Sequence, residues 1–395
     1  MLEQDPSRPR LAALTSLRFF AAMHVVIFHL ASLVRGPAWY QKLASVGHLG
    51  VSFFFVLSGF ILVYTYAGRP LNRRNFWQAR VARVYPAYAT ALVAAFPYFV
   101  WTMARGQFRL VEENLASTCV LVVGLLQAWT PQTALAWNPV AWSLSAEAFF
   151  YLLFPLLLIG LSKLRPRALA AVLFGCWTLS LAMTMSYVVM RPDGVDHATS
   201  ADAGLLWLTT IKFNPLVRLP EFVLGMAAGL LYLSSRKNPK IGNGLAAGGI
   251  GGFALVVAFS DRIPFPVLHS GLVAPLFAAV IFGVATAAWE AIPTQPRWTR
   301  LLGWRGLVLL GDASYSLYLL HFVIIWAALI NFGRAITTPA GITLLLLACL
   351  GAALISYKLI EEPARRRLRP QSPGKAVATA GLWANAAKQT AVAGE

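Results

Sequence analysis

The sequence has 395 residues, of which 58% are hydrophobic and 12% are charged. Soluble chains carry roughly 25% charged residues, so this composition excludes a set of soluble domains and indicates an integral membrane protein. The 33 lysine and arginine residues outnumber the 15 acidic residues. In a membrane protein such a surplus collects in short loops on one side of the bilayer, so the charge does not indicate a nucleic-acid partner.

The three cysteines, Cys119, Cys176 and Cys349, each lie inside an apolar segment. Their positions exclude a disulfide framework and a cysteine metal cluster. We therefore expect no metal site, and any chemistry should come from histidine, acidic, serine and arginine side chains.

Ten segments are long and apolar enough to form membrane-spanning helices, which need about 20 residues. The sequence therefore predicts an all-α, polytopic membrane protein. The first segment follows basic residues, as a signal peptide would, but Arg18 and two histidines interrupt its apolar run, so we expect a permanent helix. In chain order the ten segments are 11–34, 49–67, 81–101, 140–161, 168–190, 216–233, 244–259, 270–289, 307–330 and 340–360.

A further apolar run, residues 115–129, is shorter, and the charges of the loops decide whether it crosses the membrane. If it crossed, three basic clusters, at 163–167, 236–240 and 297–305, would all lie outside the cell. Cytoplasmic loops normally carry the excess of lysine and arginine. We therefore expect this run to be a short re-entrant or buried helix, with ten crossings and both termini in the cytoplasm.

The predicted organisation has a cytoplasmic N-terminal segment (1–10), a transmembrane domain (11–363) and a basic cytoplasmic tail (364–395) that we expect to be disordered. The tail is too short for a second folded domain. The longest outer loop, 191–203, contains three aspartates and His197. Their spacing matches no metal-binding motif, so we interpret this segment as a solvated loop.

The first segment carries ionisable side chains that indicate a functional site, because a charge inside the bilayer costs about 2.5 to 3.5 kcal/mol. Arg18 and His29 are eleven residues apart, which places them on one helix face and about 16 Å apart along its axis. His24 lies about 140° from His29 around the helix, so we do not assign it to the same site. The alternatives are snorkelling of Arg18 to the interface and an interhelical hydrogen bond from His29.

The start of the fourth segment holds Trp142, Ser143, Ser145 and Glu147. Ser143 and Glu147 share a helix face, and a carboxylate at this depth needs a partner. Counted from the helix centres, His29 and Glu147 lie at similar depths, so we expect a carboxylate–imidazole pair. The alternatives are a structural polar clamp between helices and, for Trp142, a place in an interfacial aromatic belt.

Arg80 and Arg83 lie one turn apart at the cytoplasmic start of the third segment. Two guanidinium groups at the start of a helix can hold phosphates. Ordinary positive-inside charges would look the same.

Two further segments carry polar or small residues in apolar surroundings. Ser58 precedes Gly59 in the middle of the second segment, where glycine permits close approach of another backbone. Ser314, Tyr318 and His321 form one polar stripe on the ninth segment. A polar stripe in lipid indicates that this helix lines a cavity or a polar interface.

These elements, in this order, resemble the acyltransferase-3 family of integral-membrane O-acyltransferases, over residues 15–363. Members often carry a further basic residue where this chain has Ala79, and some carry an SGNH-type esterase domain, for which the tail is too short, so we expect the stand-alone form. The family's elements match Arg18 with His29, then Phe54 to Phe60, then Phe76, Arg80, Arg83 and Pro86, then Trp142 to Tyr151, and finally Gly311 to His321.

The resemblance implies transfer of an acyl group, most often acetyl from acetyl-CoA, to a hydroxyl of a sugar, a polysaccharide or a secondary metabolite at the bacterial inner membrane. It implies acyl-CoA as a co-substrate, with its phosphates at Arg18, Arg80 and Arg83, and no tightly bound cofactor. His29 would be the general base or would carry the acyl group transiently, and Glu147 would orient its imidazole. The expected cavity lining comprises Ser58, Trp142, Ser143, Ser145, Ser314, Tyr318 and His321.

Two other classes of function remain open at this point. A transporter or flippase of a glycan or lipid-linked intermediate would also place charged residues inside the membrane, although the paired broken helices of inverted-repeat transporters are not evident. A non-catalytic assembly or sensor protein is the third possibility. The identity of the acceptor does not follow from the sequence.

Overall fold

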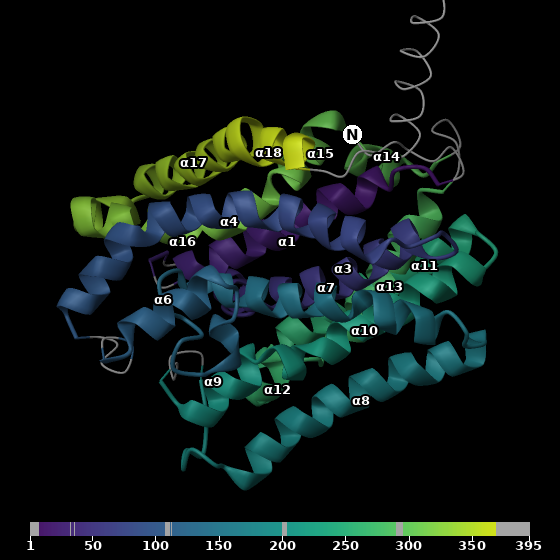
Figure 1. Cartoon of the computed structure of the whole chain (residues 1–395), viewed down its shortest axis with the longest axis horizontal. Helices are drawn as coiled ribbons and strands as arrows, with labels where there is room; N and C mark the ends of the chain where they lie inside the picture. The colour runs from purple at the N-terminus through teal and green to yellow at the C-terminus, as the bar shows by residue number, and fades with distance from the viewer. Residues whose placement is uncertain are drawn as a thin grey trace, which may run out of the picture.

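The computed structural model describes residues 8–368, apart from positions 32, 35, 107–110, 112, 200–203 and 290–294. In this described part, ten helical stretches are long and apolar enough to cross a membrane. Most of them run side by side as a bundle (Figure 1). The predicted all-α, polytopic fold is confirmed, and each of the ten predicted segments overlaps one of these stretches.

The helices have the following bounds. The ten stretches are formed by α1 (Ala12–Leu30), α2 (Ala38–Ser45) with α3 (Gly50–Tyr66), α4 (Arg73–Ala104), α7 (Trp142–Leu161), α8 (Pro166–Met190), α9 (Leu206–Phe213) with α10 (Pro215–Ser234), α11 (Pro239–Ala258), α12 (Phe265–His269) with α13 (Ala274–Ala287), α16 (Ser314–Phe332), and α17 (Pro339–Ser356) with α18 (Glu362–Leu368). Between α13 and α16 lie the short helices α14 (Arg297–Leu302) and α15 (Arg305–Asp312). The short 3₁₀ turns are Gly47–Leu49, Gln127–Trp129, Pro139–Ala141, Ser260–Arg262 and Gly333–Thr337, and a π-helical turn spans Tyr357–Glu361.

The apolar run between α4 and α7 forms the nine-residue helix α6 (Leu115–Val123) and a 3₁₀ turn. Nine residues rise about 14 Å, which is less than half of a hydrocarbon core about 30 Å thick. Tyr88 OH donates a hydrogen bond to Val122 O (2.5 Å), and Gln127 Nε2 donates to Ala141 O (3.1 Å). These bonds tie the run to α4 and to the start of α7. The predicted short helix is present, with Thr118 and Val122 buried and Leu115, Val120 and Val123 exposed.

Asn-Pro pairs begin three of the spanning helices. The side chains of Asn138, Asn214 and Asn238 each accept a hydrogen bond from the backbone N–H two residues later. The proline that follows each asparagine has no N–H that needs a partner. The pairs therefore help to satisfy the backbone groups of a helix end, which water reaches poorly at a membrane.

Facing glycines bring α3 and α10 into backbone contact at the centre of the bundle. A Cβ atom on Gly59 would lie 2.2 Å from Phe222 O, and one on Gly225 would lie 2.1 Å from Val56 O. Both distances are too short for any side chain, so the contact requires glycine. The close approach predicted at Gly59 is confirmed.

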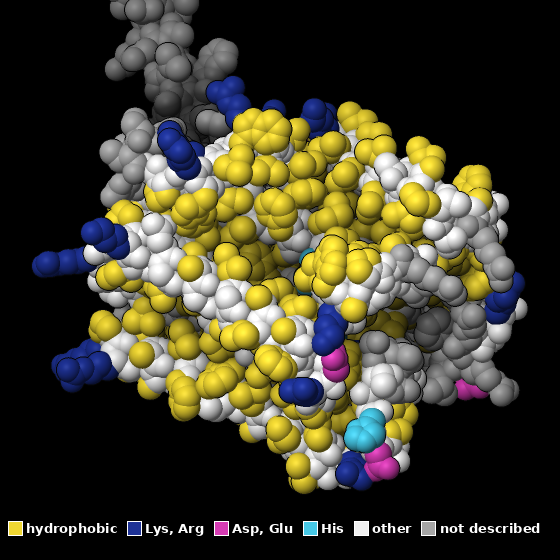
Figure 2. Space-filling view, turned by 180° about the vertical axis from the view of Figure 1, so that it is seen from behind, with side chains coloured by type: hydrophobic (Ala, Val, Ile, Leu, Met, Phe, Trp, Pro, Cys, Tyr) yellow, Lys and Arg dark blue, Asp and Glu magenta, His cyan; other side chains and the backbone are white. Residues whose placement is uncertain are grey.

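The outer surface of the bundle is apolar. Figure 2 shows hydrophobic side chains over most of one face, with lysines and arginines gathered mainly toward its edges. In the most apolar 18-residue stretch of α8, and likewise of α11, only 17% is buried. Large apolar side chains such as Leu156 and Leu255 are exposed. An apolar surface with charges at its margins is typical of a protein embedded in lipid.

Two boundaries differ from those predicted. Helix α4 begins at Arg73 rather than at 81, so Arg80 and Arg83 lie about 10 and 15 Å inside the helix and not at its start. The basic residues lower the local hydropathy, so the first two turns of α4 do not appear as part of an apolar segment. At the other end of the chain, residues 364–368 of the predicted tail belong to α18, and the rest of that tail lies outside the described residues.

Candidate active site

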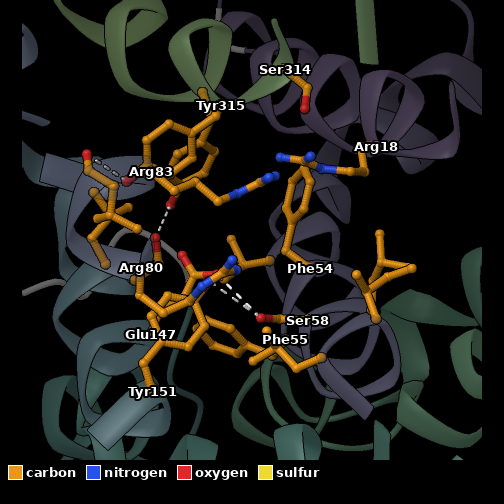
Figure 3. Close-up of a pocket in the computed structure, with 18 residues that line it drawn as sticks. Arg18, Phe54, Phe55, Ser58, Arg80, Arg83, Glu147, Tyr151, Ser314 and Tyr315 are labelled. Carbon is orange, nitrogen blue, oxygen red and sulfur yellow. Dashed lines mark hydrogen bonds between the residues drawn. The ribbon is translucent and has the colours of Figure 1, made fainter. Parts of the chain in front are cut away.

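A pocket lies between α1, α3, α4, α7 and α16 (Figure 3). It encloses about 130 Å³, which is enough for several water molecules or for the end of a substrate. Eight of the residues predicted for the site meet here, together with Tyr151 and Tyr315, to which no role had been assigned. The polar lining consists of Arg18, Ser58, Arg80, Arg83, Ser143, Glu147, Tyr151, Ser314, Tyr315 and Tyr318.

Three arginines make the pocket electropositive. Figure 3 shows the guanidinium groups of Arg18 and Arg83 pointing toward each other across it. The guanidinium carbon of Arg80 lies 5.8 Å from the ring centroid of Phe76 and 5.7 Å from that of Tyr151. None of the three arginines forms one of the ion pairs found within the described residues. Unpaired guanidinium groups that converge on a hollow favour an anionic ligand.

Glu147 is the carboxylate of the pocket and accepts hydrogen bonds from two neighbouring hydroxyl groups. Ser58 Oγ on α3 donates to Glu147 Oε1 (3.3 Å), and Tyr151 OH, one turn along α7, donates to the same oxygen. Ser58 Oγ also lies 3.5 Å from Tyr151 OH. These bonds fix the carboxylate between α3 and α7, where its negative charge partly offsets the three arginines.

Hydrogen bonds between α16 and the start of α7 close one side of the pocket. Ser143 Oγ donates to Tyr318 OH (2.8 Å), which in turn donates to Val140 O (2.7 Å). Asn138 Nδ2 donates to Leu319 O (3.0 Å), so the same turn of α16 is held twice. Of the polar stripe predicted on this helix, Ser314 and Tyr318 line the pocket, and Tyr318 also joins α16 to α7. The third residue of the stripe, His321, does not line the pocket.

His29 lies outside this pocket, near the end of α1, and its ring is half-buried. Within the described part of the chain, the side chain that it contacts through a hydrogen bond is His321, whose Nε2 lies 3.1 Å from His29 Nδ1. The predicted contact between His29 and Glu147 is absent among these described residues, because Glu147 faces Ser58 and Tyr151 instead. Depth counted along two helices says nothing about the direction in which each side chain points around its helix, and here the two side chains point to different partners.

Two other predicted lining residues lie behind the pocket wall. Trp142 is buried against Phe55 and Phe213, with ring centroids 6.1 and 4.7 Å away. Ser145 is buried, and its Oγ accepts a hydrogen bond from Ala128 N (3.3 Å). Both residues support the start of α7 from outside the hollow.

Sequence reasoning missed a buried ion pair on α10. Arg218 Nη2 lies 2.9 Å from Glu221 Oε2, and both side chains are 1% exposed. The pair is surrounded by donors and acceptors: Ser52 Oγ bonds to both residues, and Gly271 N donates to Glu221 Oε1 (2.8 Å). The spacing of three residues between an arginine and a glutamate within an apolar segment is the signal that could have found it.

A second missed residue is Glu361, which follows the apolar part of α17 in the π-helical turn. Its side chain is 1% exposed and accepts a hydrogen bond from Ser316 Oγ (3.2 Å). Ser316 itself lies between two pocket-lining positions, Tyr315 and Tyr318. A π-turn often marks a functional segment of a helix, and here it brings a buried acid behind the pocket.

The acidic outer loop has structural contacts at the positions that are described. Asp193 accepts hydrogen bonds from Trp207 N and Leu208 N at the start of α9. Asp196 pairs with Arg191. Asp202 lies outside the described residues, and within the described ones no three histidine, cysteine or acidic side chains cluster as a metal site would require.

Comparison with known proteins identifies the family of this chain. A family model for an acyltransferase domain, Acyl_transf_3, matches residues 11–358. The chain belongs to the acyltransferase-3 family. It is therefore a multi-pass membrane O-acyltransferase, and the resemblance inferred from the five sequence elements is confirmed. No solved structure shows a significant match.

Three members of the family are similar to this chain over most of its length. The chain is 28% identical to the acyltransferase MdmB of Streptomyces mycarofaciens, over 95% of this chain and 96% of that protein. It is 30% identical to the exopolysaccharide production protein ExoZ of Rhizobium meliloti, over 87% of this chain and 96% of the relative. It is 26% identical to the O-acetyltransferase OatA of Staphylococcus aureus, over 93% of this chain and 59% of the longer relative.

Proposed function

We propose that the protein transfers an acyl group, most simply acetyl, from cytoplasmic acyl-CoA to a hydroxyl group of a sugar or polysaccharide. The observation that carries this proposal is the membrane-embedded pocket in which Arg18, Arg80 and Arg83 surround Glu147. The names of the relatives support the acyl group and the acceptor class, since one is an O-acetyltransferase and another serves exopolysaccharide production.

The three arginines would bind the donor. CoA is a polyanion, and guanidinium groups form strong charge-assisted hydrogen bonds with phosphate. Arg18 lies about 9 Å from the start of α1, and Arg83 lies about 15 Å from the start of α4. A phosphate held between the two guanidinium groups would leave the pantetheine arm to run deeper along the pocket. The thioester would then lie near Ser58 and Tyr318.

His29 would act as the general base. It removes the proton of the acceptor hydroxyl, the hydroxyl oxygen bonds to the acyl carbon, the carbon–sulfur bond breaks, and CoA leaves as a thiol once it has taken up a proton. Tyr318 lines the pocket, and its ring centroid lies 6.0 Å from that of His321, which contacts His29. Donor and base would therefore meet around one turn of α16, at Tyr318.

Glu147 takes a different role from the one expected from the sequence. Its hydrogen bonds to Ser58 and Tyr151 support a role in shaping the pocket and in balancing the arginine charges. With ten crossings, the basic loops support a bacterial inner-membrane protein with both termini in the cytoplasm. The donor pocket would then be filled from the cytoplasm, and the acceptor would approach His29 from the outer side.

The experiment that tests the function uses the purified protein in lipid vesicles with acetyl-CoA labelled in its acetyl group. Label should pass to a polysaccharide acceptor as an ester that mild alkali releases. The Arg83→Ala variant, with a damaged donor site, should transfer far less. Labelled acetyl-CoA that is bound but never yields an ester with any of a panel of hydroxyl acceptors would contradict the proposal, and it would favour a transport role for the pocket.

A further inference from the structure

Two histidines from different helices, neither of which lines the pocket, contact each other next to its Tyr318 wall. His29 lies on α1 and is half-buried, whereas His321 lies on α16 and is fully buried. Their ring centroids are 4.9 Å apart, and the closest nitrogens, His29 Nδ1 and His321 Nε2, are 3.1 Å apart. This distance is that of a hydrogen bond, so one of the two nitrogens carries the proton and the other accepts it.

The surroundings of His321 decide which of its nitrogens is protonated. His321 Nδ1 lies 2.7 Å from Tyr318 O and 3.2 Å from Leu317 O. A carbonyl oxygen only accepts hydrogen bonds, so Nδ1 must be the donor. In a neutral imidazole the other nitrogen then has no proton, and His321 Nε2 presents a lone pair toward His29.

The same reasoning fixes His29. Its Nδ1 lies 2.9 Å from Val25 O as well as 3.1 Å from His321 Nε2. Both neighbours are acceptors, so His29 Nδ1 must carry a proton, and an unprotonated Nδ1 would place three lone pairs against one another. The remaining nitrogen of His29, Nε2, is left with the free lone pair that a general base requires.

We propose that His321 is the positioning residue of the general base: it holds His29 in the tautomer protonated at Nδ1, so that Nε2 is the atom that takes the proton of the acceptor hydroxyl. This inference rests on the proposed role of His29. As His29 takes up that proton it becomes an imidazolium, and its Nδ1–H bond to His321 Nε2 becomes charge-assisted and stronger. His321 thus supplies in this site what a carboxylate supplies to a catalytic histidine elsewhere.

Among the described residues, the other groups that contact His29 cannot take this role. The remaining rings in contact with it are those of Phe28 and Phe322, which have no hydrogen-bond acceptor of comparable strength. The Val25 carbonyl belongs to the same helix and would accept from His29 in any helix of this sequence. His321 is therefore the side chain that can be changed to test the arrangement.

The test compares two substitutions at one position. His321→Phe keeps a buried ring but removes the acceptor, whereas His321→Gln places an amide oxygen near the position of Nε2. We expect kcat for acetyl transfer to fall at least tenfold in His321→Phe with little change in the KM for acetyl-CoA, because His321 does not line the donor pocket. We expect His321→Gln to stay within a few-fold of the unmodified protein.

His24→Phe is the matched control, because it likewise replaces a histidine whose ring bonds to a backbone carbonyl. His24 lies on α1 and bonds to Leu43 O. It should transfer acetyl at the unmodified rate. Nitrogen-15 NMR of the ring of His29 gives a readout that loss of packing alone would not move. The signal should report a proton on Nδ1 in the unmodified protein and in His321→Gln, and a shift toward the Nε2 tautomer in His321→Phe.

The outcomes separate this inference from the function on which it rests. If His29→Ala transfers acetyl normally, the proposed role of His29 fails and the inference fails with it. If His29→Ala is inactive while His321→Phe keeps its kcat, or if the His29 ring is protonated at Nε2, the inference alone is overturned. Equal losses in His321→Phe and His321→Gln would also overturn it, since the acceptor atom would then not matter.

Discussion

His29 and the pocket arginines illustrate what single residues reveal before a structure is known. Charged side chains in apolar segments are costly, so Arg18, Glu147 and His29 stood out from the sequence alone. Their partners did not. Glu147 meets Ser58 and Tyr151, and His29 meets His321, because the rotation of one helix against another depends on packing that a pattern within a single helix cannot encode.

Removal of the His29 imidazole should abolish most of the catalysis and spare the fold. His29→Ala should lower kcat for acetyl transfer about 10²-fold or more, the usual contribution of a general base. Membrane insertion should be unaffected, because alanine is less polar than histidine. Initial rates in vesicles, normalised to folded protein by size-exclusion chromatography, measure the effect. A variant with an unchanged rate would remove His29 from the mechanism.

The arginines should act mainly on donor binding. Arg83→Ala and Arg80→Ala should each raise the KM for acetyl-CoA roughly tenfold or more, because a lost charge-assisted hydrogen bond costs about 1.5 to 3 kcal/mol. Arg74→Ala is the control, since Arg74 has the same charge, lies in the first turn of α4 and is exposed outside the pocket. Equal effects in all three variants would mean that these arginines act only through net charge or topology.

At the scale of helices, the apolar runs predicted every spanning element, and the ends were the uncertain part. Hydropathy placed the start of α10 at 216, within one residue of Pro215, but placed the start of α11 at 244, five residues after Pro239. An Asn-Pro pair stands at both starts, where proline follows a capping side chain. The start of α4 was missed because charged residues fill its first turns, even though Asn72 caps it by accepting from Asn75 N. Capping chemistry and hydropathy read together would have placed it.

The buried ion pair on α10 should contribute to stability rather than to chemistry. Arg218→Ala leaves Glu221 without its countercharge inside the bundle, which costs about 3 to 5 kcal/mol for a buried pair. We expect a clear fall in the midpoint of thermal unfolding in detergent. Arg236→Ala, an exposed arginine beyond the end of the same helix, should leave the midpoint unchanged. A similar midpoint in both variants would show that the pair is not a clamp between α3, α10 and the turn between α12 and α13.

For the whole molecule, the balance of loop charges predicted ten crossings and one additional short helix. The described residues contain ten helical stretches long and apolar enough to cross a membrane, and the short helix α6. The pocket itself was not predictable, because it is formed by five helices whose order in space is not written in their order along the chain. Only the resemblance to the family assigned its residues to one site. The polar stripes on α7 and α16 indicated cavity-facing sides without showing that they face each other.

Labelling of introduced cysteines tests the topology. Gln132 is exposed in the segment after α6, and Lys163 is exposed after α7. In a chain whose three native cysteines are replaced by alanine, Gln132→Cys should react with an impermeant thiol reagent from outside the cell, and Lys163→Cys only from the cytoplasmic side. Labelling of both positions from the same side would contradict the ten-crossing arrangement.

The most direct measurement is acetyl transfer across a sealed membrane of known orientation. Vesicles carry the protein with its basic loops facing outward, acetyl-CoA labelled in its acetyl group is supplied outside, and the polysaccharide acceptor is enclosed. We predict labelled ester on the enclosed acceptor with the unmodified protein, and at least a 10²-fold lower rate with His29→Ala. Transfer only when donor and acceptor are on the same side, or equal transfer by both proteins, would contradict a donor pocket that opens to the cytoplasm and delivers its acyl group to a base at the opposite side.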